Sequence, residues 1–310
     1  MARGRILLYL CFFALTLITT TLAGVQWLHK DPLELENFSA GLPYSGLLLL
    51  VLLSHESGHW IAARIHKVDT TYPLFIPFPF FDANPFGTAG AVIRVKGRVP
   101  SKKALFDIGA SGPISGFVVS AIILALGFRH LPAREYLYDI HPEYASLSSI
   151  PLEGLTFGKS FLYSAISRLM ATPDAFIPPM NEMYHYPFLC VGWLGLFVTA
   201  INLIPVGRLD GGHISYCMFG GKSRVIARAA LVLLTLMGLA GLLPLIGIPF
   251  SQGWYGWLVW AIILTAFMRF GRNAHPATAD DSPIDQTRFA VGIVCWVVLI
   301  VSFSPNPFSL

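Results

Sequence analysis

Charged residues are scarce in this sequence. Only 12% of its 310 residues are Asp, Glu, Lys or Arg, whereas about 25% are charged in an average soluble domain. Hydrophobic residues make up 55%, which excludes disorder and a coiled coil. Because so little charge cannot cover the surface of a water-soluble protein of this size, the composition predicts a protein embedded in a lipid bilayer.

Paired cysteines and a basic stripe are also missing. The four cysteines have no paired spacing, which excludes a small disulfide scaffold; they are Cys11, Cys190, Cys217 and Cys295. The 21 Lys and Arg exceed the 17 Asp and Glu by only four and form no stripe, so no nucleic-acid partner is expected. The sequence has no internal repeat and no long polar linker. One membrane-embedded domain over residues 1–310 is the simplest description.

Seven apolar runs approach the length of a membrane span. A helix needs about 20 mostly apolar residues to cross the hydrocarbon. The runs predict an all-α polytopic membrane protein, with spans near residues 6–23, 41–65, 110–128, 187–205, 225–248, 253–270 and 289–303. The first run is also compatible with a cleaved signal peptide, because Arg3 and Arg5 precede it and small residues follow near 21–24.

The basic residues give the predicted topology a direction. With the N-terminus inside, 16 of the 21 Lys and Arg fall on the cytoplasmic side, where such residues are in excess in membrane proteins. The favoured topology therefore has an internal N-terminus and an external C-terminus.

Two apolar stretches do not fit a simple span. Residues 73–93 carry four prolines, which a spanning helix does not tolerate together; they are Pro73, Pro77, Pro79 and Pro85. Irregular backbone at membrane depth needs protein or a cavity around it, so this run predicts a small re-entrant segment. Residues 161–171 are too few to cross, and Arg168 favours a helix at the membrane interface.

Ionisable residues interrupt the second apolar run. His55, Glu56 and His59 follow the continuous apolar stretch 47–53, and ionisable groups at that depth favour a functional interpretation. On a helix, His55 and His59 project from one face and can hold one metal ion. Glu56 is offset by one residue, which suits a base acting on water at the metal better than a ligand. The alternative is a pair of histidines satisfied by each other or by backbone carbonyls, but it does not explain Glu56.

A catalytic zinc ion takes three protein ligands and keeps one open position. Asp210 is the leading candidate for the third, because Pro205 ends a helix before it and two glycines after it allow close backbone approach. Asp107 and His213 are the other candidates. Asp107 stands before the third run, where capping a helix is its expected role, and His213 is better placed to contact a ligand than to bind the metal.

The predicted topology brings the two motifs together. A single span separates the second run from the fourth, so these two run in parallel from outside to inside. His55 lies about 10 residues before the end of its span, or roughly 15 Å at 1.5 Å per residue. The site is therefore expected within the membrane and nearer the cytoplasmic face.

These motifs resemble the site-2 protease family of intramembrane metalloproteases. His-Glu-Ser-Gly-His at 55–59 is followed, one span later, by Asn-Leu-Ile-Pro-Val-Gly-Arg-Leu-Asp-Gly-Gly-His at 202–213, and residues 87–116 are similar to the segment that links the two motifs. The resemblance covers about residues 45–220. The loops are too short for the PDZ domain that many members insert, so the chain resembles a compact member.

The resemblance implies a role for each matched residue. It implies His55, His59 and Asp210 as ligands of one Zn²⁺ ion, Glu56 as the catalytic glutamate, and Asn202 as a residue that holds the substrate or the oxyanion. It also implies that residues 86–99 form a re-entrant β-like segment that pairs with the substrate backbone. Residues 41–213 would form a catalytic core of three spans, and 224–303 three additional spans.

The predicted function is zinc-dependent intramembrane proteolysis of a transmembrane protein or peptide substrate in the lipid bilayer. A non-hydrolytic metal-binding transporter or receptor is one alternative, although a transporter is expected to carry repeated halves. An inactive scaffold relative is another, and Glu56 argues against it. The expected location is the bacterial inner membrane. Substrate identity, activating signal and oligomeric state do not follow from the sequence.

Overall fold

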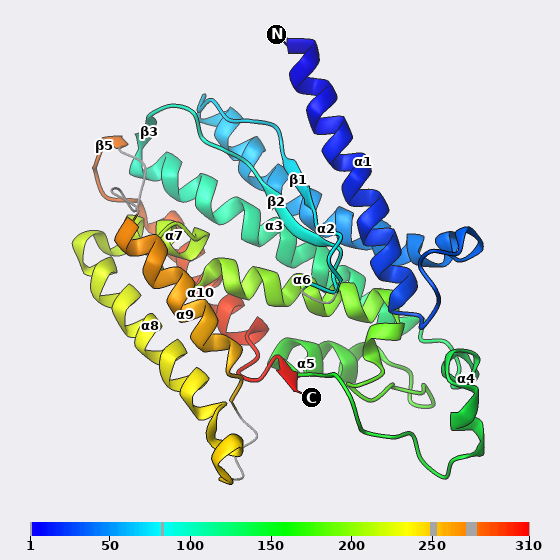
Figure 1. The fold of residues 1–310 in the computed structure, drawn as a ribbon. Helices are drawn as coiled ribbons and strands as arrows, with labels where there is room; N and C mark the ends of the chain where they lie inside the picture. The colour runs from blue at the N-terminus through cyan, green and yellow to red at the C-terminus, as the bar shows by residue number, and fades with distance from the viewer. Residues whose placement is uncertain (1, 82–83, 249–252, 271–277, 310) are drawn as a thin grey trace.

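The computed structural model describes residues 2–81, 84–248, 253–270 and 278–309, and its described part is mainly helical (Figure 1). The α-helices are α1 (Ala2–Gln26), α2 (Phe38–Ile65), α3 (Lys102–Arg129), α4 (Glu135–Ile140), α5 (Phe161–Met170), α6 (Pro187–Leu203), α7 (Asp210–Phe219), α8 (Ser223–Ala240), α9 (Gly256–Phe270) and α10 (Gln286–Ser302). The strands are β1 (Leu74–Pro77), β2 (Thr88–Val92), β3 (Val99–Ser101), β4 (Thr156–Phe157), β5 (Thr278–Asp280) and β6 (Phe308–Ser309). Each of the seven predicted apolar runs lies largely in a helix.

In the part of the chain that the structure describes, four helical segments are long and apolar enough to cross a membrane. They are Ile6–Gln26, Leu35–Ile65, Lys102–Arg129 and Asp210–Ile246. The other three apolar helices are α6, α9 and α10, of 17, 15 and 17 residues, which is shorter than the about 20 residues that a straight span needs. The protein is therefore a helical membrane protein with four candidate spans, and the predicted total of seven stays a prediction.

Large apolar side chains cover the outward faces of the long helices. Ile6 and Leu7 on α1, Leu236 on α8 and Ile300 on α10 are each more than half exposed. A water-soluble protein rarely exposes so much contiguous apolar surface, whereas a bilayer accommodates it. The scarcity of charge in the sequence thus has its structural counterpart on these surfaces.

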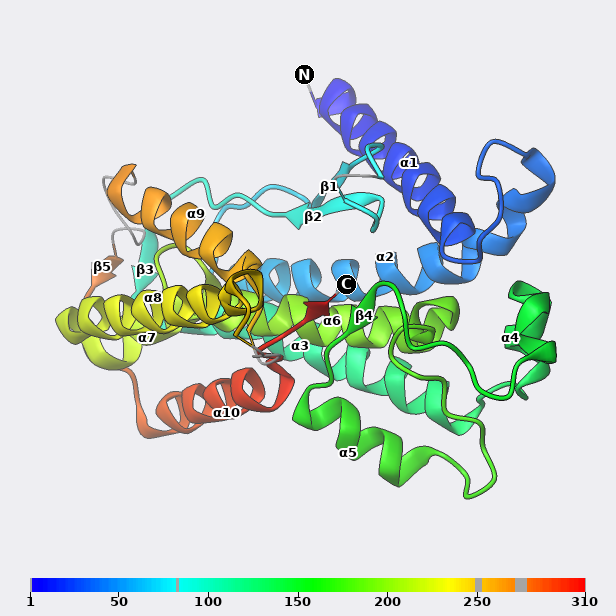
Figure 2. The ribbon, with the colours of Figure 1, turned by 60° about the horizontal axis from the view of Figure 1, so that its bottom comes forward.

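The centre of the molecule is formed by α2, α3 and α6, which pack against one another (Figure 2). Small residues allow the close approach. A side-chain carbon at Gly58 of α2 would lie 2.4 Å from the Ser111 carbonyl oxygen of α3, and one at Gly192 of α6 would lie 2.8 Å from Leu124 Cβ. Close packing through small residues is typical of helices in membranes. It brings the polar residues of the three helices into one buried region.

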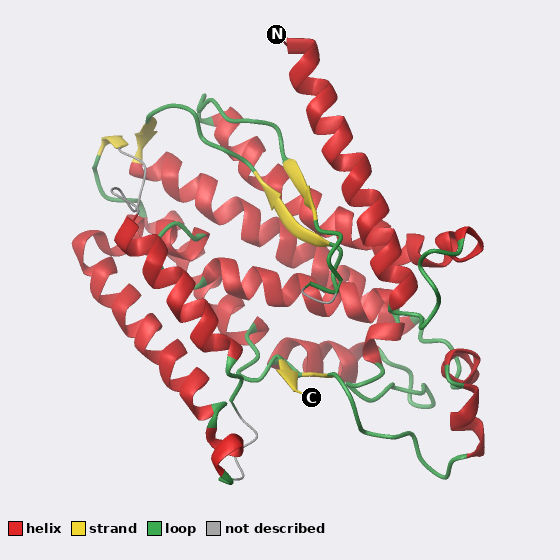
Figure 3. Cartoon of the chain, viewed as in Figure 1, coloured by secondary structure: helices red, strands yellow, loops and turns green. Residues whose placement is uncertain are grey.

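The proline-rich run between α2 and α3 forms an antiparallel hairpin of β1 and β2 (Figure 3). Its register pairs Leu74 with Val92 and Phe75 with Ala91, and it shifts after Phe75. The prolines predicted that no helix forms here, and the family resemblance implied a β-like segment at residues 86–99. Residues 82 and 83 of the predicted segment lie outside the described residues.

The hairpin runs along α1 and α2. The Phe75 ring packs edge-on against Phe13 of α1, with ring centroids 5.2 Å apart. Beyond the strands, the Phe86 carbonyl oxygen accepts a hydrogen bond from Tyr44 Oη at 3.3 Å, and the Phe86 ring lies 6.2 Å from that of Trp27. Trp27 immediately follows α1, and Tyr44 lies in the second turn of α2. The hairpin therefore extends from the C-terminal end of α2 towards its N-terminal end.

The segment between α3 and α6 is held against the helical bundle. It contains α4, α5 and β4, together with the short 3₁₀ helices Pro142–Ser146 and Met183–His185. Helix α5 coincides with the short helix predicted at 161–171, and its Tyr163 is buried against Phe128 of α3. Strand β4 pairs with β6 near the C-terminus, and β3 pairs with β5. Three further short 3₁₀ helices complete the described structure, at Leu35–Asn37, Gly220–Lys222 and Leu243–Ile246.

Candidate metal centre

Three side chains from two separate motifs meet in the bundle. His55 and His59 lie one helical turn apart on the buried face of α2, and their Nε2 atoms are 3.1 Å from each other. Asp210, the first residue of α7, places Oδ2 3.4 Å from each of these nitrogens. The i, i+4 spacing on a helix thus gives the expected shared face, and packing supplies the carboxylate.

A sharp reversal of the chain brings Asp210 to the histidines. Helix α6 ends at Leu203, and α7 begins at Asp210 after a short turn. Gly207 in this turn has a positive φ of 57°, which favours glycine. A Cβ atom at Gly211 would lie 1.9 Å from the Leu203 carbonyl oxygen. The glycines therefore allow α7 to fold back onto the end of α6.

Two glycines of α3 make room for the imidazole rings. A Cβ atom at Gly112 would lie 2.1 Å from His59 Nε2, and one at Gly116 would lie 3.1 Å from His55 Nδ1. Any larger residue at 112 would have to displace the imidazole ring. These glycines therefore serve helix packing and at the same time define the space in which the two histidines lie.

The donor atoms suit a metal ion. His59 Nδ1 lies 2.6 Å from the Ile108 carbonyl oxygen, and a carbonyl only accepts, so Nδ1 carries the proton and Nε2 presents a lone pair. A hydrogen bond of this kind fixes the tautomer and the ring orientation of metal-binding histidines. Two imidazole nitrogens and one carboxylate oxygen form a three-ligand set of the kind found at catalytic zinc. The residues present therefore fit the ion that the sequence predicts.

Glu56 and Asn202 lie beside this cluster. Both line a cavity of about 280 Å³ that also contains His55, His59 and Asp210. Glu56 is buried, and it lies beside the backbone of Ile93, which follows β2. Every predicted site residue thus borders one cavity, with Glu56 next to the ligand set and outside it.

A second cavity of about 400 Å³ shares His55, Glu56 and Asn202 with the first. It extends between the hairpin and α6, where residues 88–92 form one wall. The two cavities together form a path from the cluster along the edge of β2. An extended peptide segment would find backbone groups of the hairpin along this path.

The two alternative ligands have different surroundings. His213 lines the same cavity one turn after Asp210 and lies against Gly109 of α3, whereas Asp107 lies outside the ligand set. The Asp107 carboxylate accepts hydrogen bonds from Arg288 Nε at 2.8 Å and Nη2 at 2.7 Å and lies 2.8 Å from His66 Nε2.

The expected capping role of Asp107 is wrong. Helix α3 begins five residues earlier, at Lys102, and Ser101 Oγ accepts the capping hydrogen bond from the Ala104 N–H at 3.2 Å. A serine at this position in extended backbone is a good cap, so the helix begins more than one turn before Asp107. Asp107 instead joins α3 to α10 through a charge-assisted pair with Arg288.

A family of known proteins matches the region that carries both motifs. Peptidase family M50 matches residues 44–245, which is about two thirds of the chain and includes both motifs. The chain belongs to peptidase family M50. This agrees with the resemblance to site-2 proteases drawn from the motifs.

Curated relatives of this M50 chain come from plants. It is 27% identical over 302 residues to the probable zinc metalloprotease EGY2, chloroplastic, of Arabidopsis thaliana, covering 96% of this chain and 48% of the relative. It is 30% identical over 267 residues to the probable zinc metalloprotease EGY1, chloroplastic, of Oryza sativa subsp. japonica, covering 86% and 41%. The chain therefore spans about half the length of the curated relatives it matches. Both relatives are named as chloroplastic proteins, so they do not support the expected location in a bacterial inner membrane.

Sequence reasoning missed the backbone groups that complete this M50 site. The Ile108 carbonyl orients His59, and the Ile93 backbone contacts Glu56. Backbone groups are the same in every residue, so no pattern of residue types could have singled them out. Which backbone groups reach the site depends on which segments pack side by side in the folded chain.

Proposed function

We propose that this chain is a zinc-dependent intramembrane endopeptidase that hydrolyses peptide bonds in or near the transmembrane segments of membrane proteins. The observation that carries the proposal is the convergence of His55, His59 and Asp210 beside the buried carboxylate of Glu56. Membership of family M50 and the names of the relatives support it. When bound by these three residues, zinc would polarise the scissile carbonyl and lower the pKa of a water molecule.

Residues of the chain itself have separate roles in the proposed reaction. Glu56 takes the proton of the attacking water and passes it to the leaving amine, because it adjoins the ligand set without belonging to it. The Asn202 side-chain amide donates a hydrogen bond to the substrate oxygen as negative charge develops there. His59 keeps its orientation through the Ile108 carbonyl.

Residues 41–213 form the catalytic core in this proposal, and residues 224–303 contribute three additional spans. The distribution of basic residues favours an internal N-terminus, so in this proposal the end of α2 that carries His55 faces the cytoplasmic side. The hairpin is re-entrant, and its contacts with Trp27 and Tyr44 support this depth, because both residues lie towards the opposite ends of α1 and α2.

The substrate pairs with the free edge of the hairpin. The Arg94 N–H donates to Thr71 Oγ1, and the Arg94 carbonyl oxygen accepts from the Thr71 N–H, each at 2.9 Å. Successive residues of an antiparallel strand direct their backbone groups to opposite sides, so those of Ile93 and Ala91 are directed away from β1. This is the side on which Ile93 reaches Glu56. An unwound substrate segment needs partners for its freed backbone groups, and this edge supplies them by strand addition.

Removing the metal tests the proposed function. The full chain is reconstituted in liposomes with a purified single-span membrane protein, and cleavage is followed by gel and mass spectrometry. We expect a zinc chelator to abolish cleavage and added Zn²⁺ to restore it, while a serine-protease inhibitor has no effect. Cleavage that continues after complete removal of the metal would exclude a metalloprotease.

Ala91→Pro tests the strand-addition step. Proline removes the Ala91 N–H from the free edge but leaves the Arg94 pairing intact, and edge strands tolerate proline. One lost hydrogen bond of about 0.5–1.5 kcal/mol predicts a decrease in kcat/KM of about 2- to 10-fold. Zinc content should not change. Ala91→Val keeps the N–H and serves as the control; equal kcat/KM values for the two variants would argue against substrate pairing at this edge.

A further inference from the structure

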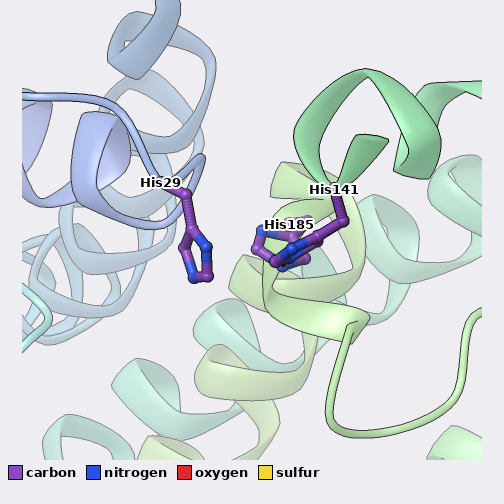
Figure 4. A group of neighbouring side chains, drawn as sticks. All are labelled: His29, His141 and His185. Carbon is purple, nitrogen blue, oxygen red and sulfur yellow. Dashed lines mark hydrogen bonds between the residues drawn. The ribbon is translucent and has the colours of Figure 1, made fainter. Parts of the chain in front are cut away.

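A second group of histidines lies at the other end of α6. His29 follows α1, His141 precedes the 3₁₀ helix Pro142–Ser146, and His185 ends the 3₁₀ helix Met183–His185 just before α6 (Figure 4). Potential ligand nitrogens of all three lie within 4.8 Å of one another. Three segments that are far apart in the sequence thus direct imidazole rings to one place.

The protonation of two of these rings follows from their outer contacts. His185 Nδ1 lies 2.5 Å from the Trp27 carbonyl oxygen, which only accepts, so Nδ1 carries the proton. His141 Nδ1 lies 3.2 Å from Glu143 Oε1, another acceptor. In the neutral tautomers, both Nε2 atoms therefore present lone pairs, and these atoms are only 3.0 Å apart.

A buried carboxylate points at the same place. Glu182 is 2% exposed, and its Oε1 accepts hydrogen bonds from Asn181 Nδ2 at 2.9 Å and from Tyr144 Oη at 3.1 Å. Its Oε2 lies 3.1 Å from His185 Nε2 and 3.6 Å from His141 Nε2. This oxygen accepts no hydrogen bond from the residues that the structure describes. Three acceptor atoms thus face one another, and their lone pairs repel one another unless a cation lies among them.

The same geometry occurs at the candidate metal centre. There, two Nε2 atoms and one carboxylate oxygen are separated by 3.1, 3.4 and 3.4 Å. In the second group the corresponding separations are 3.0, 3.1 and 3.6 Å. In both groups a carbonyl oxygen accepts a hydrogen bond from the outer nitrogen of one histidine. Within the described residues, the groups of three whose ligand atoms all lie within 4.8 Å of one another are His55, His59 and Asp210 at the candidate metal centre and His29, His141 and His185 here.

We propose that His141, His185, Glu182 and His29 form a second metal site, which binds Zn²⁺ or a similar first-row divalent cation. Zn–N distances of about 2.0–2.1 Å with tetrahedral angles place ligand atoms roughly 3.3 Å apart, close to the 3.0, 3.1 and 3.6 Å among His141, His185 and Glu182, and His29 lies within 4.8 Å of the other two histidines. Imidazole and carboxylate ligands of this kind are typical of zinc. With four ligands the coordination is complete, so this site is structural and the metal centre at the other end of α6 remains the catalytic one.

His29 completes the set from a special backbone position. Its φ is +54°, a left-handed conformation that non-glycine residues rarely adopt. The ring lies edge-on to His141 and His185, with centroids 4.7 and 5.0 Å away. A metal bond to His29 would join the end of α1 to the segment between α3 and α6. The bound ion therefore holds three parts of the chain together.

The two sites are too far apart to share an ion. His185 lies just before α6, and Asn202 of the candidate metal centre lies near the other end of that helix. Seventeen residues at 1.5 Å each separate the two ends by roughly 25 Å. Loss of one site should therefore leave the other occupied.

Counting metal ions per chain tests the proposal. The full chain and its variants are purified in detergent, equilibrated with Zn²⁺, freed of excess metal and analysed by mass spectrometry for zinc and protein. We expect His141→Ala combined with His185→Ala to bind one Zn²⁺ fewer than the wild type. His130→Ala removes an exposed histidine outside the group and should leave the zinc count unchanged. An unchanged count in the double variant would overturn the proposal.

The reciprocal variant separates this proposal from the proposed function. His55→Ala combined with His59→Ala should lose proteolysis and retain one Zn²⁺ per chain. If that variant binds no zinc, the second site does not exist. A third outcome is that the wild type does not cleave substrates, while the His141→Ala, His185→Ala variant still binds one Zn²⁺ fewer than the wild type. The second site would then be supported and the proposed function would be wrong.

A conservative variant covers the case in which the double substitution prevents folding. Glu182→Gln keeps the size of the side chain and its Oε1 contacts but removes the charge. In the folded Glu182→Gln protein, we expect Zn²⁺ affinity at this site to fall by at least tenfold and the thermal stabilisation by Zn²⁺ to shrink. If Zn²⁺ stabilises the wild type and Glu182→Gln equally, the Glu182 carboxylate pairs with a protonated histidine and does not bind metal.

Discussion

Glu56→Gln is expected to abolish cleavage of a single-span substrate while leaving the zinc content unchanged. Glutamine has nearly the same shape and fills the same place beside His55, His59 and Asp210, but it cannot accept the proton of the attacking water. General base catalysis contributes about 10²- to 10⁴-fold to the rate, so we expect kcat to fall by at least about 10²-fold. The measurement is single-turnover cleavage in proteoliposomes together with zinc analysis.

The matched control is Glu135→Gln, which makes the same change at an exposed position of α4. It should cleave at the wild-type rate. Unchanged cleavage by Glu56→Gln would refute the assignment of Glu56 as the base. Loss of zinc from Glu56→Gln would instead show that the carboxylate is a ligand, contrary to its place outside the set of three. A comparison of the membrane-protein fragments released by the wild type and by Glu56→Gln would also identify substrates.

Asp210→Ala is expected to remove zinc from the candidate metal centre, lowering the content by one ion per chain, and to abolish activity. Asp210 contributes the carboxylate oxygen that lies 3.4 Å from both Nε2 atoms, and alanine leaves two histidines facing each other. Loss of a residue that only supports a ligand already costs about 10- to 100-fold in metal affinity. Loss of a ligand should cost at least as much, measurable by competition with a chelator of known affinity.

Asp107→Asn is the informative partner of that variant. It alters the aspartate that pairs with Arg288, outside the ligand set, so zinc content should stay at the wild-type value. Stability can fall, because the charge-assisted pair between α3 and α10 is broken, and the thermal midpoint would report that separately. If Asp107→Asn loses zinc and Asp210→Ala retains it, the third ligand is wrongly assigned.

Local patterns predicted the parts of this protein that depend on neighbouring residues. The seven apolar runs predicted where helices form, and the prolines of residues 73–93 predicted that no helix forms there. The i, i+4 spacing of His55 and His59 predicted two imidazoles on one helical face. Boundaries were less predictable. The predicted third span begins at residue 110, whereas α3 begins at Lys102, because Ser101 caps the helix and the residues after it are good helix formers.

Chain reversals and distant pairings were beyond these patterns. The sequence left Asp210, Asp107 and His213 as alternative third ligands, and packing placed Asp210 between the histidines and Asp107 beside Arg288. The contact between Asp107 and Arg288 joins residues 181 positions apart. No periodicity extends over such a separation, because the position of α10 against α3 depends on the packing of every helix between them.

The residues alone predicted a membrane-embedded helical protein with a metal-binding motif in its second apolar run. Scarcity of charge, length of apolar runs and helical periodicity are local or compositional properties, and they follow directly from the residues. Helix packing brings the Asp210 carboxylate to His55 and His59 and the Ile108 carbonyl to His59. It also brings His29, His141 and His185 together, with Glu182 beside His141 and His185. Such sites could not be predicted in full because they are assembled from segments that packing brings together, and no short stretch of sequence encodes the distances between those segments.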